Sequence, residues 1–264
     1  MKKAPSHDAV RGERIAKVMA RAGLCSRRDA ERWIADGRVT VDGHVLDTPA
    51  FLVTPETKVL VDGMPLPRSE EPRLWRYYKP GGLVTTARDP RGRPTVFDSL
   101  PPGLPRVISV GRLDITSEGL LLLTNHGALK RYLELPSTGW VRRYRVRAHG
   151  TPTPQQLASL ADGVTVEGVH YGPIQTSIER QQGGNCWLAM ALTEGKNREV
   201  RRVCEHFGLK VNRLIRVAYG PFQLGELEPG EAREMPARVL REQLGSQVWN
   251  DILSDRHADR RGKA

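Results

Sequence analysis

Residues 110–127 read VGRLDITSEGLLLLTNHG, and this stretch decides the expected fold. The leucine run 120–123 is flanked by glycines, at 119 and 127, a pattern typical of a strand that is buried on both faces. Asp114 lies in the short polar loop 114–119 immediately before this strand, so its carboxylate is expected to be held next to the core. Such a carboxylate either caps its own loop or takes part in chemistry, and both interpretations fit these residues.

The composition of the chain narrows its class. The 264 residues carry a formal net charge of +11, which favours a polyanionic partner. The length allows one large domain, or a small domain and a medium one. Cys25, Cys186 and Cys204 are far apart and form no CxxC motif. Their spacing argues against a disulfide framework or a zinc ribbon and predicts a reducing compartment.

Targeting and cofactor motifs are not found in the sequence. The first residues, MKKAPSHDAV, include no apolar segment of a signal peptide, and no apolar stretch approaches membrane-spanning length. We therefore expect a soluble, cytoplasmic protein. There is no dinucleotide-binding fingerprint, phosphate-binding loop or HExxH motif, and the histidines show no ligand pairing. We expect neither a cofactor nor a metal ion.

Residues 1–63 are expected to form a small N-terminal domain. Apolar residues recur at helical spacing within residues 14–22, and Ser26 with Asp29 forms a capping-box pattern at the start of a second helix. The sequence VTVDGHVL (39–46) then predicts a hairpin with its turn at Asp42-Gly43. This helix–helix–hairpin unit resembles the S4 RNA-binding domain over RIAKVMARAGLCSRRDAERWIADGRVTVDG (14–43).

The rest of the chain is expected to form one larger domain and a tail. Residues 64–73 (MPLPRSEEPR) are rich in proline and charge, which is typical of a linker. Strand-like and helical segments alternate irregularly over residues 74–235, which predicts an α+β domain. Residues 236–264 are expected to form an amphipathic helix followed by a polar basic tail, DRHADRRGKA.

Tyr144 is the second candidate site residue. In VRRYRVRA (141–148) apolar residues and arginines alternate, so Tyr144 would share the inner face of a strand while the arginines at 143, 145 and 147 share the outer face. A tyrosine of the core is the ordinary interpretation. A flat ring at the edge of a cleft is also what a protein needs to stack on an extruded base.

Arg201 is the third candidate. Residues 197–208 (NREVRRVCEHFG) predict a helix, with an apolar stripe and a stop at Gly208. On a helical wheel Arg201 borders the apolar stripe, whereas Arg198 and Arg202 point roughly the opposite way. Arg201 is thus the arginine expected to reach a semi-buried carboxylate. A structural salt bridge is the competing explanation.

Taken together, these segments resemble one family: the RNA pseudouridine synthases that modify small- and large-subunit ribosomal RNA and carry an S4 domain ahead of the catalytic domain. The matching segments are YYKPGG (77–82), DPRGRPTVFD (89–98), VGRLDITSEGLLLLT (110–124), RRYRV (142–146) and EGKNREVRRVCEHFGLKVNRLIRVAYG (194–220). Ser117 stands where threonine is more usual. The NREVRR segment (197–202), together with the later NRLIR segment (212–216), looks most similar to the branch that acts on 23S rRNA, although Asn212 stands where that branch usually has serine.

The resemblance implies a fold, an activity and site residues. The fold would be a central antiparallel sheet flanked by helices, and the activity would be conversion of a uridine in rRNA to pseudouridine. Asp114 would be the catalytic aspartate, Tyr144 the tyrosine that stacks on the target base, and Arg201 the basic residue paired with Asp114. The expected RNA-binding residues are Arg14, Lys17, Arg27, Arg28, Arg32, Lys79, Arg91, Arg93 and Arg112. Each of these taken singly is also compatible with an ordinary solvated side chain.

Other functions remain open at this point. An S4-domain ribosome-assembly factor without catalysis would explain the charge equally well, a synthase acting on 16S rRNA would explain the motifs, and an S4-linked RNA methyltransferase would need an S-adenosyl cofactor. The missing glycine fingerprint after a strand disfavours the methyltransferase. We expect a monomer whose partner is ribosomal RNA, with 23S rRNA as the first candidate.

Overall fold

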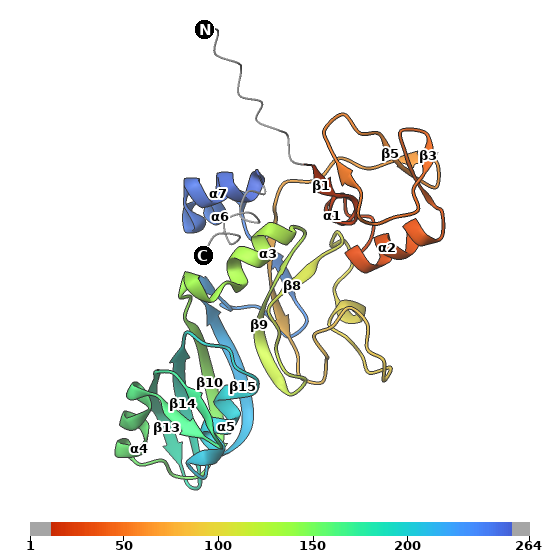
Figure 1. Ribbon diagram of the computed structural model, residues 1–264. Helices are drawn as coiled ribbons and strands as arrows, with labels where there is room; N and C mark the ends of the chain where they lie inside the picture. Colours follow the sequence, from red (N-terminus) through yellow and green to blue (C-terminus); the bar gives the residue numbers. More distant parts are fainter. Residues whose placement is uncertain (1–11, 255–264) are drawn as a thin grey trace. The chain divides into compact units, whose positions relative to one another are not determined.

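The computed structural model describes residues 12–254 and divides the chain into two compact units, residues 1–71 and 72–264 (Figure 1). Each unit has its own hydrophobic core and is described by itself. The predicted basic tail, residues 255–264, lies outside the described residues, as do residues 1–11.

The first unit combines two helices with small sheets. Helix α1 spans Ile15–Arg21 and α2 spans Arg27–Ala35. The predicted capping box at the start of α2 is confirmed, because the Ser26 hydroxyl accepts from the Asp29 backbone N–H at 3.1 Å while the Asp29 carboxylate accepts from the Ser26 N–H. The strands are β1 (Glu13–Arg14), β2 (Val39–Val41), β3 (His44–Val45), β4 (Leu52–Val53), β5 (Val59–Val61) and β6 (Met64–Pro65).

The predicted hairpin of the first unit is also confirmed. Strands β2 and β3 pair antiparallel, and the turn between them places Asp42 at φ 48° and Gly43 at φ 89°. The sheet order is β3-β2-β5-β6. Because β6 pairs with β5, Met64 and Pro65 belong to this sheet and not to the linker in which the sequence placed them. Backbone pairing outweighs the proline-rich composition here, since an edge strand tolerates proline.

The second unit is built on a nine-stranded sheet in the order β13-β14-β10-β15-β9-β7-β17, with β16 paired to β15 and β8 paired to β9. The α+β class with a central, mainly antiparallel sheet is confirmed; β9 and β15 are the parallel pair. The sheet strands are β7 (Leu74–Lys79), β8 (Ile108–Val110), β9 (Ser117–Thr124), β10 (Arg142–His149), β13 (Ile174–Gln182), β14 (Asn185–Leu192), β15 (Lys210–Tyr219), β16 (Phe222–Gln223) and β17 (Ala232–Glu234). A separate hairpin joins β11 (Val164–Val166) and β12 (Val169–Tyr171).

Strand β9 lies at the centre of the second unit. All four leucines at 120–123 are fully buried, as the sequence predicts. Leu120 and Leu122 pack into one cluster, whereas Leu121 and Leu123 pack into another on the opposite face. Two buried faces explain the unbroken apolar run.

Helices cover parts of this sheet. They are α3 (Gly127–Glu134), α4 (Pro154–Ser159), α5 (Glu199–His206), α6 (Ala237–Leu244) and α7 (Ser246–Leu253). Helix α5 packs with β10 and β14 through Val200, Val203 and Cys204. The single C-terminal helix expected from the sequence is two helices, because Gly245 at φ 81° interrupts it, and both pack on the core of the second unit.

Candidate active site

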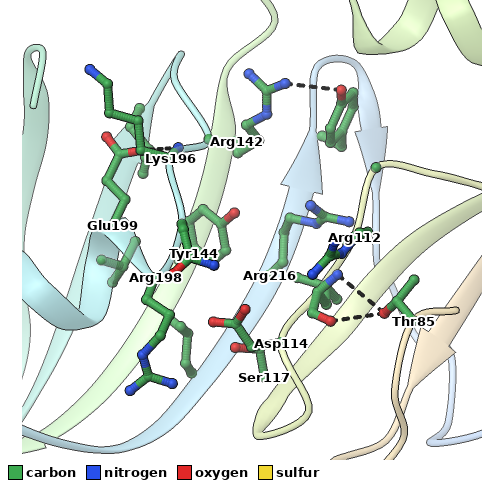
Figure 2. Close-up of a pocket in the computed structure, with 18 of the residues that line it drawn as sticks. Thr85, Arg112, Asp114, Ser117, Arg142, Tyr144, Lys196, Arg198, Glu199 and Arg216 are labelled. Atoms are coloured by element: carbon green, nitrogen blue, oxygen red, sulfur yellow. Dashed lines mark hydrogen bonds between the residues drawn. The ribbon is translucent and has the colours of Figure 1, made fainter. Parts of the chain in front are cut away.

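A cavity of about 600 Å³ lies in the second unit, a size typical of ligand pockets. It is bounded by the loop that carries Asp114, by strands β10 and β15, and by the segment 195–200 that leads into α5 (Figure 2). The charged side chains that line it are Arg112, Asp114, Lys130, Glu134, Arg142, Lys196, Arg198, Glu199 and Arg216. Because the cations outnumber the carboxylates, the cavity suits an anionic ligand.

Asp114 lies in the loop between β8 and β9, half-buried, and lines the cavity. The backbone on both sides of it is fixed. The Ser117 N–H donates to the Asp114 carbonyl at 3.0 Å, and the Thr85 hydroxyl donates to the Leu113 carbonyl at 2.8 Å. Within residues 12–254 the Asp114 carboxylate has no hydrogen-bond or ion-pair partner, so it does not cap its own loop.

Lys79 holds the Asp114 loop from behind. Its ammonium group donates to the carbonyls of Ser117 at 2.9 Å and Pro80 at 3.0 Å, and it lies 3.5 Å from the carbonyl of Ile115. Lys79 is fully buried, and burial lowers its pKa to about 8, partly opposed by the charges of Asp114 and Glu118. The prediction of Lys79 as an RNA-contacting residue is therefore wrong. Lys79 is the last residue of β7, and its side chain points into the protein. Because β7 is buried on both faces, its sequence shows no polar–apolar alternation from which this direction could be predicted.

The side chain of Arg201 also holds the Asp114 loop, by hydrogen bonds to backbone carbonyls. Its guanidinium donates to the carbonyl of Thr116 at 3.1 Å and to that of Val211 at 3.2 Å, and its side chain is buried behind the cavity wall. Burial lowers the pKa of Arg201, as does the nearby charge of Arg198, and the charge of Asp114 opposes the shift. The direct ion pair expected between Arg201 and Asp114 is not formed in this structure.

Tyr144 and Arg216 lie next to each other on the cavity wall. Strands β10 and β15 pair antiparallel and place Tyr144 directly opposite Arg216. Figure 2 shows Asp114, Tyr144 and Arg216 around the same space. Arg216 is almost fully buried and donates from Nε to the Leu120 carbonyl at 2.8 Å. One of its terminal nitrogens is buried without a partner, so an acceptor in the cavity would satisfy it.

Sequence reasoning missed three arginines that line the cavity: Arg216, Arg142 and Arg198. Arg142 has the same strand parity as Tyr144, a signal that the alternation of β10 already contained. Helical spacing places Arg198 on the far side of a helix, but α5 begins only at Glu199, and Arg198 precedes it at φ 53°. This left-handed conformation removes Arg198 from the helical wheel and turns it to the cavity. The Glu199 carboxylate accepts from the Lys196 N–H at 2.8 Å, which fixes the turn, and burial raises its pKa.

The other predicted RNA-binding residues lie in several places. Arg112 is exposed and lines the cavity. Arg91 and Arg93 lie in an exposed loop away from the cavity lining, and Arg93 forms a salt bridge of 2.9 Å with Asp89.

The remaining predicted residues belong to the first unit. Arg14, Arg27 and Arg28 are exposed. Lys17 pairs with Glu13 at 2.6 Å, and Arg32 forms a salt bridge with Asp29 on α2. Part of the predicted basic surface is thus neutralised within the unit itself.

Residues 12–254 also lack two other kinds of site. They contain no group of three or more His, Cys, Asp or Glu side chains placed to hold a metal ion. None of their helices combines the length and apolar character needed to cross a membrane.

Comparisons with known proteins were made for both units. Residues 13–63 match the S4 domain model, and residues 73–206 match the model described as RNA pseudouridylate synthase. A Rickettsia bellii protein named uncharacterized RNA pseudouridine synthase is 51% identical over 229 residues, which cover 87% of this chain and 99% of that protein. The ribosomal large subunit pseudouridine synthase B of Yersinia pestis is 45% identical over 222 residues, 81% of this chain and 69% of that protein. A solved structure entitled crystal structure of pseudouridylate synthase has 25% identity and a TM-score of 0.61 over 87% of this chain and 99% of that one.

Proposed function

The chain belongs to the RNA pseudouridylate synthase family and is an RNA pseudouridine synthase, and on this premise we propose that it converts a specific uridine of 23S ribosomal RNA to pseudouridine, with Asp114 as the catalytic carboxylate. One observation carries the proposal. The Asp114 carboxylate, which has no partner among the described residues, and the aromatic ring of Tyr144 on β10 line the same cationic cavity.

The choice of ribosomal RNA rests on the relatives. Proteins of Pseudomonas aeruginosa, Yersinia pestis and Salmonella typhi that are 44–45% identical to this chain are named ribosomal large subunit pseudouridine synthase B. An S4 domain is also present in front of the catalytic domain. We propose that the enzyme acts as a cytoplasmic monomer.

The reaction rearranges bonds within one nucleotide. The bond between N1 of uracil and carbon 1 of the ribose breaks, the base rotates in the cavity, and carbon 5 joins carbon 1. The proton leaves carbon 5 and N1 gains a proton, so no oxidant, reductant or group donor is consumed. The target base must first leave its helix, which costs about a few kcal/mol, and the cationic lining offsets part of this cost by binding phosphates.

Asp114 acts on the ribosyl unit, either as a nucleophile at carbon 1 or as a base at carbon 2. The held backbone of its loop positions the carboxylate before substrate arrives, which favours either role. A primary isotope effect with deuterium at carbon 2 of the ribose distinguishes them. The base mechanism requires the effect, and the nucleophilic mechanism does not.

Tyr144 stacks on the extruded uracil and accepts or relays the proton from carbon 5. Arg216, which lies opposite Tyr144 and lines the same cavity as Asp114, supplies positive charge to the site during the reaction. The sequence suggested Arg201 for this role. We propose instead that Arg201 is a positioning residue, which holds the Asp114 loop through the Thr116 carbonyl.

The test is release of tritium from uracil carbon 5 of labelled 23S rRNA. Wild-type protein should release it, and Asp114→Asn should lose at least about 10²–10⁴-fold in rate while still binding the RNA. If the wild type releases tritium from 16S rRNA only, the target assignment fails. If it releases none from either RNA, the S4-domain assembly factor is the better explanation.

The modified position can be mapped in cells. Primer extension after carbodiimide treatment of rRNA from a strain that lacks the gene should show the loss of one pseudouridine stop in 23S rRNA. Restoring wild-type protein should return the stop, whereas Asp114→Asn should not.

A further inference from the structure

The sheet face opposite the cavity carries a second concentration of positive charge. Arg143, Arg145 and Arg147 of β10 alternate with Tyr144 and Val146 and point to the other side of the sheet, where all three are exposed. Alternate residues of a strand are about 6.8 Å apart, so these arginines form a row along the strand. We call this face, with its cations Arg143, Arg145, Arg147, Arg180, Lys210 and Arg213, the outer arginine face.

The charges of this face are not balanced within the protein. Arg147 lies directly opposite Arg213 on β15, and like charges in this position destabilise a sheet. Glu179 pairs with Arg145 at 2.8 Å, and Glu118 pairs with Arg213 at 2.9 Å. Among the described residues, Arg143 and Arg147 have neither an ion pair nor a side-chain hydrogen bond. An anionic ligand would relieve this repulsion.

An aromatic ring lies within the row of arginines. Trp187 of β14 is directly opposite Arg147 on one side and Arg180 on the other. It is half-buried, and the Arg145 guanidinium lies 4.9 Å from its ring centroid. The next outward residues of β14 are Ala189 and Ala191, which are small enough to leave the surface flat beside the ring.

Helices α3, α6 and α7 pack on the neighbouring part of the same side of the sheet. The cluster formed by α3, α6 and α7 includes Leu120 of β9 and Ile215 of β15, and Trp187 lies at its margin. Ile215 is opposite Arg145, so the two residues share a face. The apolar cover ends here, and the exposed arginines of β10 begin.

We propose that the outer arginine face binds an unpaired strand of the substrate RNA, outside the segment that enters the cavity. A positively charged, flat surface with an aromatic ring is what sequence-tolerant binding of single strands requires. Arginine guanidinium groups can bind phosphates and stack on bases, which suits them to such a surface better than lysine. The inference rests on the proposed function only in that the bound polyanion is taken to be RNA.

The test measures how salt weakens binding of a fluorescein-labelled oligouridylate to the full chain. All variants carry Asp114→Asn, so turnover does not affect the readout. Each phosphate contact contributes about 0.7 to the slope of log affinity against log salt concentration for a single strand. Arg143→Gln/Arg147→Gln should therefore reduce the magnitude of the slope by about 1.4. The matched control, Arg131→Gln/Arg238→Gln, removes two exposed arginines from α3 and α6 and should leave the slope unchanged.

The aromatic contribution is tested separately. Trp187→Leu should weaken binding by roughly 5- to 150-fold, whereas Trp187→Phe should largely retain it, because stacking requires a ring. Oligouridylate substituted with 4-thiouridine should crosslink to peptides of β10 and β14.

Three results would overturn the inference: a slope that Arg143→Gln/Arg147→Gln leaves unchanged, an equal reduction in the control, or crosslinks confined to other segments. The outcome is independent of the tritium assay. If Arg143→Gln/Arg147→Gln leaves the salt slope unchanged and wild-type protein releases tritium, only the proposal for the outer arginine face is rejected. If the double substitution lowers the slope but wild-type protein releases no tritium, only the catalytic proposal is rejected.

Discussion

The ammonium nitrogen of Lys79 lies 2.9 Å from the carbonyl oxygen of Ser117, and this contact joins the end of β7 to the start of β9. Asp114 stands at the other end of the short turn that Ser117 closes. The buried side chains of Lys79 and Arg201 thus hold the backbone carbonyls of the loop, while the Asp114 carboxylate itself lines the cavity. The site is positioned through its main chain.

Lys79→Met is expected to lower kcat by about 100-fold, since a small displacement of a catalytic group has that effect. The KM for RNA should stay near that of the wild type, because Lys79 does not reach the surface. Steady-state tritium release provides both constants, and the exposed Lys58→Met serves as the control. A raised KM with a normal kcat would instead place Lys79 in contact with RNA.

The burial of Lys79 also predicts a pH dependence of stability. Its pKa is lowered from 10.5 to about 8 in the folded protein, so between these values the unfolded chain binds more protons at this side chain than the folded one. The cost of burying the charge is fully present below pH 8 and is lost as the pH rises toward 10.5. The free energy of unfolding of wild type minus that of Lys79→Met, from urea titrations, should therefore increase over this window. A flat difference would show that Lys79 titrates normally.

Arg216 and Arg201 are expected to respond differently to substitution. Arg216→Met removes a cation from the cavity and should lower kcat by about 10²–10³-fold. Arg201→Met leaves the carbonyls of Thr116 and Val211 without their donor and should lower the free energy of unfolding by about 1–3 kcal/mol. Single-turnover rates and urea unfolding of both variants check this. An Arg201→Met protein of normal stability with the larger rate loss would restore Arg201 as the direct partner of Asp114.

Gly119 is expected to tolerate no side chain. It has φ +95°, and a Cβ there would lie 2.4 Å from the Arg216 carbonyl oxygen, where β9 and β15 run parallel. Gly119→Ala should destabilise the protein by about 2–6 kcal/mol through strain and overpacking. Gly127→Ala is the matched control, because its Cβ would meet nothing within 4 Å. Thermal unfolding of the two variants side by side would contradict the prediction if their Tm values were similar.

Much of the framework could be predicted because local patterns agree with the tertiary structure. The leucine run of β9 and the alternation of β10 each fix which face is buried, and the capping box fixes the start of α2. Strand parity alone also placed Tyr144 on the face of the cavity.

The site residues that were misplaced depend on information that these patterns lack. Arg198 itself has a left-handed backbone conformation, which turns its side chain to the cavity. Helical periodicity in the sequence does not predict this conformation. Lys79 has the composition of a surface residue but finds buried carbonyls from a loop far along the chain. Arg216 becomes visible as a site residue only once β15 is known to pair with both β9 and β10.

Strand β15 pairs with both β9 and β10, and this limits where residues can be inserted or deleted in the chain. The strand fixes Arg216 against Tyr144 on one edge and against Gly119 on the other. Inserting or deleting one residue before this point would turn the guanidinium to the opposite side of the sheet. The turn at Glu167 and Gly168, between β11 and β12, carries no such constraint. Length variation should therefore accumulate in that hairpin, while residues 210–219 keep a constant spacing.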